Sequence, residues 1–107
     1  MSDDAMKKML QRAREMQEKQ NRRLADTLVQ ASAAGGKVRG RMNGHRALLQ
    51  VQVDRDLVRA ENREALEGYV VELVNDLIDQ IDKVLEERFG IVDKMPSLST
   101  EHLFGKR

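Results

Sequence analysis

The chain changes from helix patterning to sheet patterning within Ala34-Gly35-Gly36-Lys37-Val38-Arg39-Gly40-Arg41-Met42-Asn43-Gly44-His45. Gly35-Gly36 can turn the chain, because glycine adopts positive φ without the clash that a Cβ would cause. From residue 37 to residue 42, basic side chains alternate with apolar ones or glycine, which is typical of a strand with one charged face. Asn43-Gly44 is typical of a type I′ hairpin turn, which needs positive φ at both central residues. These residues predict a turn, a strand and a tight hairpin.

Helix and strand patterns lie on both sides of this stretch. Ser2, Asp3 or Asp4 can cap the first helix, and the last helix can begin at Asn62 and end at Gly90. The predicted elements, in order, are a helix over residues 3–27, strands over 28–33, 37–42 and 47–53, a connector over 54–61 and a helix over 62–89. The predicted fold class is therefore α+β, with the order α-β-β-β-α and a three-stranded antiparallel sheet.

Alternation assigns the faces of the strands. In the first strand, the expected alternation is Val29, Ala31 and Ala33 against Leu28, Gln30 and Ser32. In the third strand, the side chains expected to face inward are Leu49, Val51 and Val53, and those expected to face outward are Leu48, Gln50 and Gln52. The sheet should thus have one apolar and one polar face.

The two helices differ in the width of their apolar stripe. The first has a narrow stripe of coiled-coil width that includes Met6, Met9, Leu10, Ala13 and Met16. It should therefore pack on one neighbour, and at ~1.5 Å per residue it should project beyond the sheet. The second has a broad stripe, which indicates burial on two sides. Because a three-stranded sheet has two unpaired edges and one helix covers only one face, we expect a homodimer.

Composition limits the classes of function. The 107 residues suggest one domain over residues 1–90, followed by a poorly ordered tail over 91–107 that holds the single proline, Pro96. The chain has no cysteine and no apolar run long enough to span a membrane, and its first residues do not predict a secretory signal, which is consistent with a cytoplasmic protein. His45 and His102 stand alone, and the chain shows no metal, nucleotide or nucleophile motif. We expect a non-enzyme without cofactor, metal or small-molecule substrate.

Basic residues are concentrated in the first half of the chain. Residues 1–46 hold 11 Lys/Arg and 5 Asp/Glu, whereas residues 47–107 hold 8 and 13. Such asymmetry indicates an interaction surface. One candidate group lies on the first helix, at Lys7, Lys8, Arg12, Arg14, Lys19, Arg22 and Arg23; a second follows the central strand, at Lys37, Arg39, Arg41 and Arg46, with no acid among them.

Each group also has a plain structural interpretation. On the helix, Glu15–Lys19 and Glu18–Arg22 are favourable i,i+4 pairs of a solvated surface. On the strand, the charges would prevent aggregation between sheets. The functional interpretation is contact with phosphates. The few aromatic side chains lie outside the basic half, which favours duplex backbone contact over stacking on single strands.

The chain resembles the YbaB/EbfC nucleoid-associated DNA-binding proteins of bacteria over roughly residues 6–89. The matching residues are the opening helix from Met6-Lys7-Lys8-Met9 to Met16-Gln17-Glu18-Lys19, Gly35-Gly36-x-Val38, Asn43-Gly44, Val53-Asp54, Glu64-Ala65-Leu66-Glu67 and Asn75-Asp76. The chain departs from the family in three places. A β-branched residue is usual where Gly40 stands, a proline is common where Arg55 stands, and a small residue is usual where Leu77 stands.

The resemblance implies an α-β-β-β-α fold, a tweezer-like homodimer and binding to duplex DNA with low to moderate sequence preference. It also implies a role in nucleoid organisation or gene regulation, in the cytoplasm at the nucleoid. Two alternatives stay open. The first helix could be the coiled-coil arm of a structural or adaptor protein, or the basic surface could bind RNA.

Overall fold

The computed structural model describes residues 2–92, so most of the predicted tail, residues 93–107, lies outside the described residues. The predicted order of elements is confirmed. The helices and strands are α1 (Asp3–Asp26), β1 (Leu28–Ala33), β2 (Val38–Asn43), β3 (Leu48–Val53) and α2 (Arg63–Phe89), with short 3-10 turns η1 (Ala34–Gly36), η2 (Arg55–Leu57) and η3 (Ala60–Asn62). The strands form one antiparallel sheet in the order β1-β2-β3.

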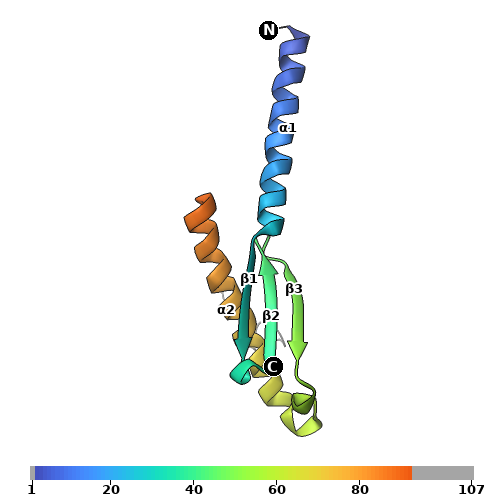
Figure 1. Cartoon of the computed structure of the whole chain (residues 1–107), viewed down its shortest axis with the longest axis vertical. Helices are drawn as coiled ribbons and strands as arrows, with labels where there is room; N and C mark the ends of the chain where they lie inside the picture. The colour runs from blue at the N-terminus through green and yellow to red at the C-terminus, as the bar shows by residue number, and fades with distance from the viewer. Residues whose placement is uncertain (1, 93–107) are drawn as a thin grey trace, which may run out of the picture.

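The first helix projects from the rest of the molecule, as its length predicts. Figure 1 shows α1 rising from the end of the sheet, and the protein measures 69 × 30 × 23 Å. Ser2 caps the helix by accepting a hydrogen bond from the Ala5 amide at 3.3 Å. The carboxylates of Asp3 and Asp4, in the first turn, interact favourably with the positive end of the helix dipole. The apolar stripe of α1 was expected to pack on one neighbour. Within the described part of the chain it packs on none, because no residue of α1 is buried.

The second helix and two of the strands make the core. α2 packs on β1 and β2, on one face of the sheet. The buried side chains come from alternate strand positions and from the broad stripe of α2, and are Val29, Ala33, Val38, Met42, Leu73, Leu77, Ile78, Ile81 and Leu85. The predicted alternation of β1 and β2 is therefore confirmed.

The ends of α2 differ in how well the sequence predicts them. Gly90 is left-handed at the C-terminus, with φ of 66°, and the next amide bonds to the carbonyl of Leu85 at 3.0 Å. Asn62 stands at the N-terminus but makes no side-chain cap. Its Nδ2 instead donates to the carbonyls of Asp56 and Leu57 at 3.5 and 3.4 Å, so this side chain braces the preceding loop.

The turn between β2 and β3 is not type I′, which corrects the prediction from Asn43-Gly44. Neither residue has positive φ; Arg46 does, at 60°. The side-chain oxygen Oδ1 of Asn43 accepts hydrogen bonds from the backbone amides of His45 and Ala47 at 2.9 and 3.2 Å. These bonds stabilise a loop that is longer than a two-residue hairpin turn. Gly44 donates its amide to the carbonyl of Leu24 at 2.8 Å, so the loop serves contact with α1.

The third strand is exposed along most of its length, so the burial expected for Leu49 and Val51 is wrong, although Val51 pairs with Gly40 and faces the α2 side as predicted. These side chains are 50% and 38% exposed. A helix ~10 Å wide over β1 and β2 does not reach a third strand ~4.8 Å further on. A bulge also shifts the register, so that Leu48, which was expected to face outward with Gln50 and Gln52, pairs with Met42 and lies on the same face of the sheet as that buried side chain. The sheet therefore has an uncovered apolar edge.

Candidate nucleic-acid interface

The basic residues of α1 stand in solvent around a projecting helix. All are exposed: Lys7, Lys8, Arg12, Arg14, Lys19, Arg22 and Arg23. Within residues 2–92, none of them lies within 4.0 Å of a carboxylate, and so neither Glu15–Lys19 nor Glu18–Arg22 forms the predicted pair. Residues 7–23 hold seven Lys/Arg and two Asp/Glu, a net charge of +5. This helix is a long cationic surface whose charges can meet an external anion.

The base of α1 is held by the β2–β3 loop and by α2. Besides the Gly44 amide, the loop brings His45, whose Nε2 lies 3.1 Å from the carbonyl of Asn21. The guanidinium of Arg23 lies over the ring of Phe89, 5.0 Å from its centroid. These contacts fix the last turns of α1 against the body and leave its first five turns free of it.

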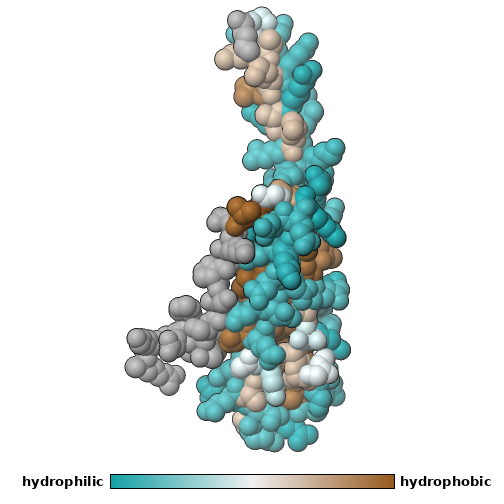
Figure 2. Space-filling model, turned by 90° about the vertical axis from the view of Figure 1, so that its left-hand side faces the viewer, coloured by the Kyte–Doolittle hydropathy of each residue, from teal (hydrophilic) through white to brown (hydrophobic). Residues whose placement is uncertain are grey.

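One side of α1 is apolar, and it is exposed to solvent like the basic residues of the same helix. Met6, Met9, Leu10 and Met16 are 56%, 58%, 60% and 73% exposed. Figure 2 shows apolar residues gathered along one side of the projecting helix and hydrophilic residues along the other. The helix therefore offers both a cationic and an apolar surface to partners.

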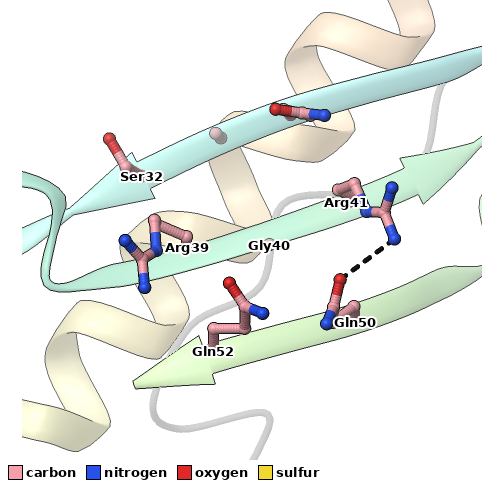
Figure 3. A pocket seen from close by; sticks show the side chains of 8 residues that line it. Ser32, Arg39, Gly40, Arg41, Gln50 and Gln52 are labelled. Atoms are coloured by element: carbon pink, nitrogen blue, oxygen red, sulfur yellow. Dashed lines mark hydrogen bonds between the residues drawn. The ribbon is translucent and has the colours of Figure 1, made fainter. Parts of the chain in front are cut away.

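The sheet face turned away from α2 is polar and hollowed. Its register aligns two rows across the three strands: the first rung is Gln30–Arg41–Gln50, and the second rung is Ser32–Arg39–Gln52. Between the rungs lie Ala31 and Gly40, and the hollow has a volume of about 630 Å³. In Figure 3 the labelled side chains of both rungs stand on the same side of the sheet, with α2 behind it. Arg41 Nη2 donates to Gln50 Oε1 at 3.0 Å.

The structure brings acids to the strand group that the sequence expected to lack them. Lys37 Nζ lies 2.8 Å from Asp56 Oδ2, and Arg39 Nη2 lies 3.5 Å from Asp54 Oδ1. The hydrogen bond from Lys37, with its charge, lowers the pKa of Asp56 below its ordinary 3.8. The same contact raises the pKa of Lys37 above its ordinary 10.5. Arg41 differs from Lys37 and Arg39 in that it donates its hydrogen bond to a neutral side chain, that of Gln50.

Arg46 lies apart from the other strand cations. Its Nε donates to Asp82 Oδ1 of α2 at 3.1 Å, and the two side chains are 21% and 10% exposed. Because α2 covers the opposite face of the sheet, Arg46 does not join the rungs. Its contact fastens the β2–β3 loop to α2, where removing one partner would leave a nearly buried charge.

Sequence analysis missed the amide and hydroxyl members of the rungs. The outward alternation of Gln50 and Gln52 and of Gln30 and Ser32 was present in the pattern, but only the strand register aligns them with Arg39 and Arg41. Asp54 and Asp56 were missed because they lie 15 and 19 residues from their partners.

Two further features bear on the class of protein. In residues 2–92, no three His, Cys, Asp or Glu side chains are grouped so that they could hold a metal ion. Neither described helix combines the length and apolarity that crossing a membrane requires.

Lys and Arg side chains clustered along one exposed helix are typical of a nucleic-acid-binding surface. The model of the YbaB/EbfC DNA-binding family matches residues 1–94. The chain therefore belongs to this family, which is a DNA-binding family and not an enzyme family. The resemblance stated from the sequence is confirmed.

Individual relatives agree. The chain is 36% identical over 80 residues to a nucleoid-associated protein of Methylococcus capsulatus, covering 75% of this chain and 74% of that protein. It is 28% identical over 85 residues to a nucleoid-associated protein of Koribacter versatilis, covering 79% and 84%. The crystal structure of an uncharacterized protein from Helicobacter pylori matches with a TM-score of 0.58 and 23% identity, over 74% of this chain and 92% of that one, and shows the same fold.

Proposed function

We propose that this protein binds duplex DNA at the nucleoid as a homodimer, chiefly through contacts between phosphates and the basic residues of α1. The observation that carries the proposal is the projecting helix, whose Lys and Arg side chains are exposed and lie beyond 4.0 Å from any carboxylate of residues 2–92. Membership of a DNA-binding family and the names of the nucleoid-associated relatives support it. Nucleoid organisation or gene regulation is the role that follows.

The mechanism is electrostatic. Each Lys or Arg that neutralises a phosphate releases a condensed counterion, so affinity falls as the salt concentration rises. The net charge of +5 over residues 7–23 supplies this effect, and a dimer doubles it. The contacts are expected at Lys7, Lys8, Arg12, Arg14, Lys19, Arg22 and Arg23, with Lys37, Arg39 and Arg41 as the second group. Arg46 is left out of that group, because it binds Asp82 on the α2 side of the sheet.

Duplex DNA fits this surface better than a single strand does. Proteins that bind single strands use exposed aromatic side chains on which bases stack. Tyr69 and Phe89 are half-buried beside the core, and Arg23 lies over the Phe89 ring. The described part of α1 has no aromatic residue, which leaves backbone contact as the main interaction.

A homodimer accounts for the uncovered edge of the sheet. Leu48, Leu49 and Val51 of β3 are 44%, 50% and 38% exposed, and the strand has one unpaired edge. A second copy can cover these apolar side chains. Sedimentation equilibrium at micromolar concentration tests this part, and a mass equal to that of the 12.2 kDa monomer contradicts it.

Fluorescence anisotropy with two labelled duplexes of unrelated sequence, across a salt series, tests DNA binding. We expect similar affinities for both duplexes and a steep fall as salt rises, with a slope of log K against log salt near −0.9 per phosphate neutralised. A matched RNA duplex added as competitor separates DNA from RNA binding. Absence of binding at low salt contradicts the proposal.

One observation favours a second candidate, an adaptor that uses α1 as a coiled-coil arm. The exposed stripe of Met6, Met9, Leu10 and Met16 has the width of a coiled-coil seam. Charge reversal on the basic flanks should leave such an arm functional, whereas it should abolish phosphate contact. The two candidates therefore give opposite results in one experiment.

A further inference from the structure

We propose that the open face of the sheet enters the major groove of duplex DNA and binds base edges through the first and second rungs. This inference rests on the proposed duplex binding and adds a second surface with a different task. α1 supplies affinity through phosphates, whereas the rungs supply a preference for particular base pairs.

The chemistry of the rungs is that of base recognition. Four of the six side chains are neutral, with amide or hydroxyl groups, and the other two are guanidinium groups. Arginine binds the O6 and N7 atoms of guanine with two hydrogen bonds, and glutamine binds adenine N6 and N7 in the same way. Glutamine can also donate to phosphate oxygens, but only a base edge uses both the donor and the acceptor of its amide. The alignment of the three glutamines with Arg39 and Arg41 indicates hydrogen bonding to bases.

The central strand holds the arginines where they can reach a groove floor. Arg39 and Arg41 lie on β2, and the neutral members of the rungs lie on β1 and β3 at either side. Figure 3 shows the arginines and their flanking polar side chains on the solvent side of the sheet. The hydrogen bond from Arg41 occupies Gln50 Oε1 and leaves the Gln50 amide hydrogens as donors for a ligand.

Dimensions of the sheet match the major groove. The ~12 Å major groove admits two adjacent strands, such as β2 and β3 with axes ~4.8 Å apart, whereas the ~6 Å minor groove does not. The rungs are two residues apart, or ~6.8 Å in an antiparallel sheet. Two base-pair steps span the same ~6.8 Å. A strand that runs along the groove would therefore place Arg39 and Arg41 on bases two steps apart.

The far side of the central strand packs against α2. Gly40, between the two arginines, has no side chain on either face, and a Cβ built on it would lie 3.0 Å from the Leu73 Cδ2 of α2. Arg39 and Arg41 are exposed, so their replacement removes ligand contacts without removing core contacts.

The experiment compares one guanine-rich duplex of about 20 base pairs with the same duplex containing 7-deazaguanine. This base lacks the N7 acceptor in the major groove but keeps the charge, the pairing and the minor groove. With the full chain, we expect the dissociation constant to be at least about five-fold higher for the modified duplex, the lower end of the discrimination typical of one bidentate contact. Arg39→Ala with Arg41→Ala should reduce this ratio to one.

A matched control removes the same charge elsewhere. Arg55→Ala with Arg59→Ala changes two exposed arginines outside the rungs and should keep the ratio while lowering affinity for both duplexes equally. Equal affinity of the unmodified protein for both duplexes overturns the groove contact and leaves the proposed function intact. A ratio that persists in Arg39→Ala with Arg41→Ala also overturns it. Absence of binding to either duplex at low salt overturns the proposed function as well.

Discussion

Leu77 of α2 occupies space that a side chain at Gly40 of β2 would need. A Cβ built on Gly40 would lie 3.3 Å from Leu77 Cδ1 and 3.0 Å from Leu73 Cδ2. In the sequence these positions are two separate departures from the pattern of the family: Gly40 is smaller than the residue usual at its position, and Leu77 is larger than the residue usual at its position. In the structure they compensate each other, because the missing side chain on the strand makes room for the larger one on the helix.

Gly40→Val should destabilise the protein by about 2–3 kcal/mol, because the added side chain would overpack a region bounded by the Leu73 and Leu77 side chains and the Gln50 backbone carbonyl. Leu77→Ala should also destabilise it, by roughly 2–5 kcal/mol, because Leu77 is fully buried. Together the two changes should cost at least ~1 kcal/mol less than their sum. Urea unfolding of the four proteins measures this coupling, and simple additivity would contradict the compensation.

Gly44→Ala should loosen the base of α1. An added Cβ would lie 2.5 Å from the Leu24 carbonyl oxygen, which also accepts the Gly44 amide, so the loop and the helix must move apart. We expect lower stability in urea and faster hydrogen exchange in the last turn of α1. Gly68→Ala is the matched control, because an added Cβ there meets nothing within 4 Å inside a helix, and it should raise stability by about 1 kcal/mol.

Stability should depend on pH through Lys37 and Asp56. The folded-state pKa of Asp56 lies below 3.8, so its contribution is complete above that value and is lost as pH falls through the lowered pKa. The pKa of Lys37 lies above 10.5, so its contribution is complete below that value and is lost as pH rises through the raised pKa. The unfolding free energies of the wild type and of Asp56→Asn should therefore differ most between these limits. A difference that persists below the acidic limit would contradict the assignment.

Lys8→Glu with Arg12→Glu should weaken binding to unrelated duplexes equally, by at least about ten-fold, because both phosphate contacts become repulsions. The fold should not change, since α1 buries no residue within the described part of the chain. Arg59→Glu with Lys83→Glu provides the control, because it reverses two exposed charges outside α1. Anisotropy measures affinity, and unchanged binding would remove α1 from the mechanism.

Local patterns predicted the element bounds of this protein closely. The strand bounds agree within one residue, and β1 agrees at both ends, because alternation and the flanking glycines are properties of adjacent residues. Gly90 stops α2 and Ser2 caps α1 for similarly local reasons. The family resemblance also follows from the sequence, since its motifs are short and ordered along the chain.

The candidate site was only half predictable. The basic residues of α1 are exposed where the helix pattern places them, because a projecting helix has few neighbours to rearrange its surface. The strand group changed its character in the structure. Lys37 and Arg39 form ion pairs with acidic side chains, and Arg46 lies on the α2 side of the sheet. The strand register aligns the glutamines of β3 with Arg39 and Arg41.

The order of helices and strands, their capping and the basic character of the first half of the chain follow from neighbouring residues, whose φ preferences and periodicity act over a few positions. Tertiary structure decided which faces those residues meet. α2 is wide enough for two strands and leaves Leu49 and Val51 exposed, and the register sets Arg41 beside Gln50. Contacts such as Arg46 with Asp82 join residues 36 positions apart, and no local preference encodes that distance.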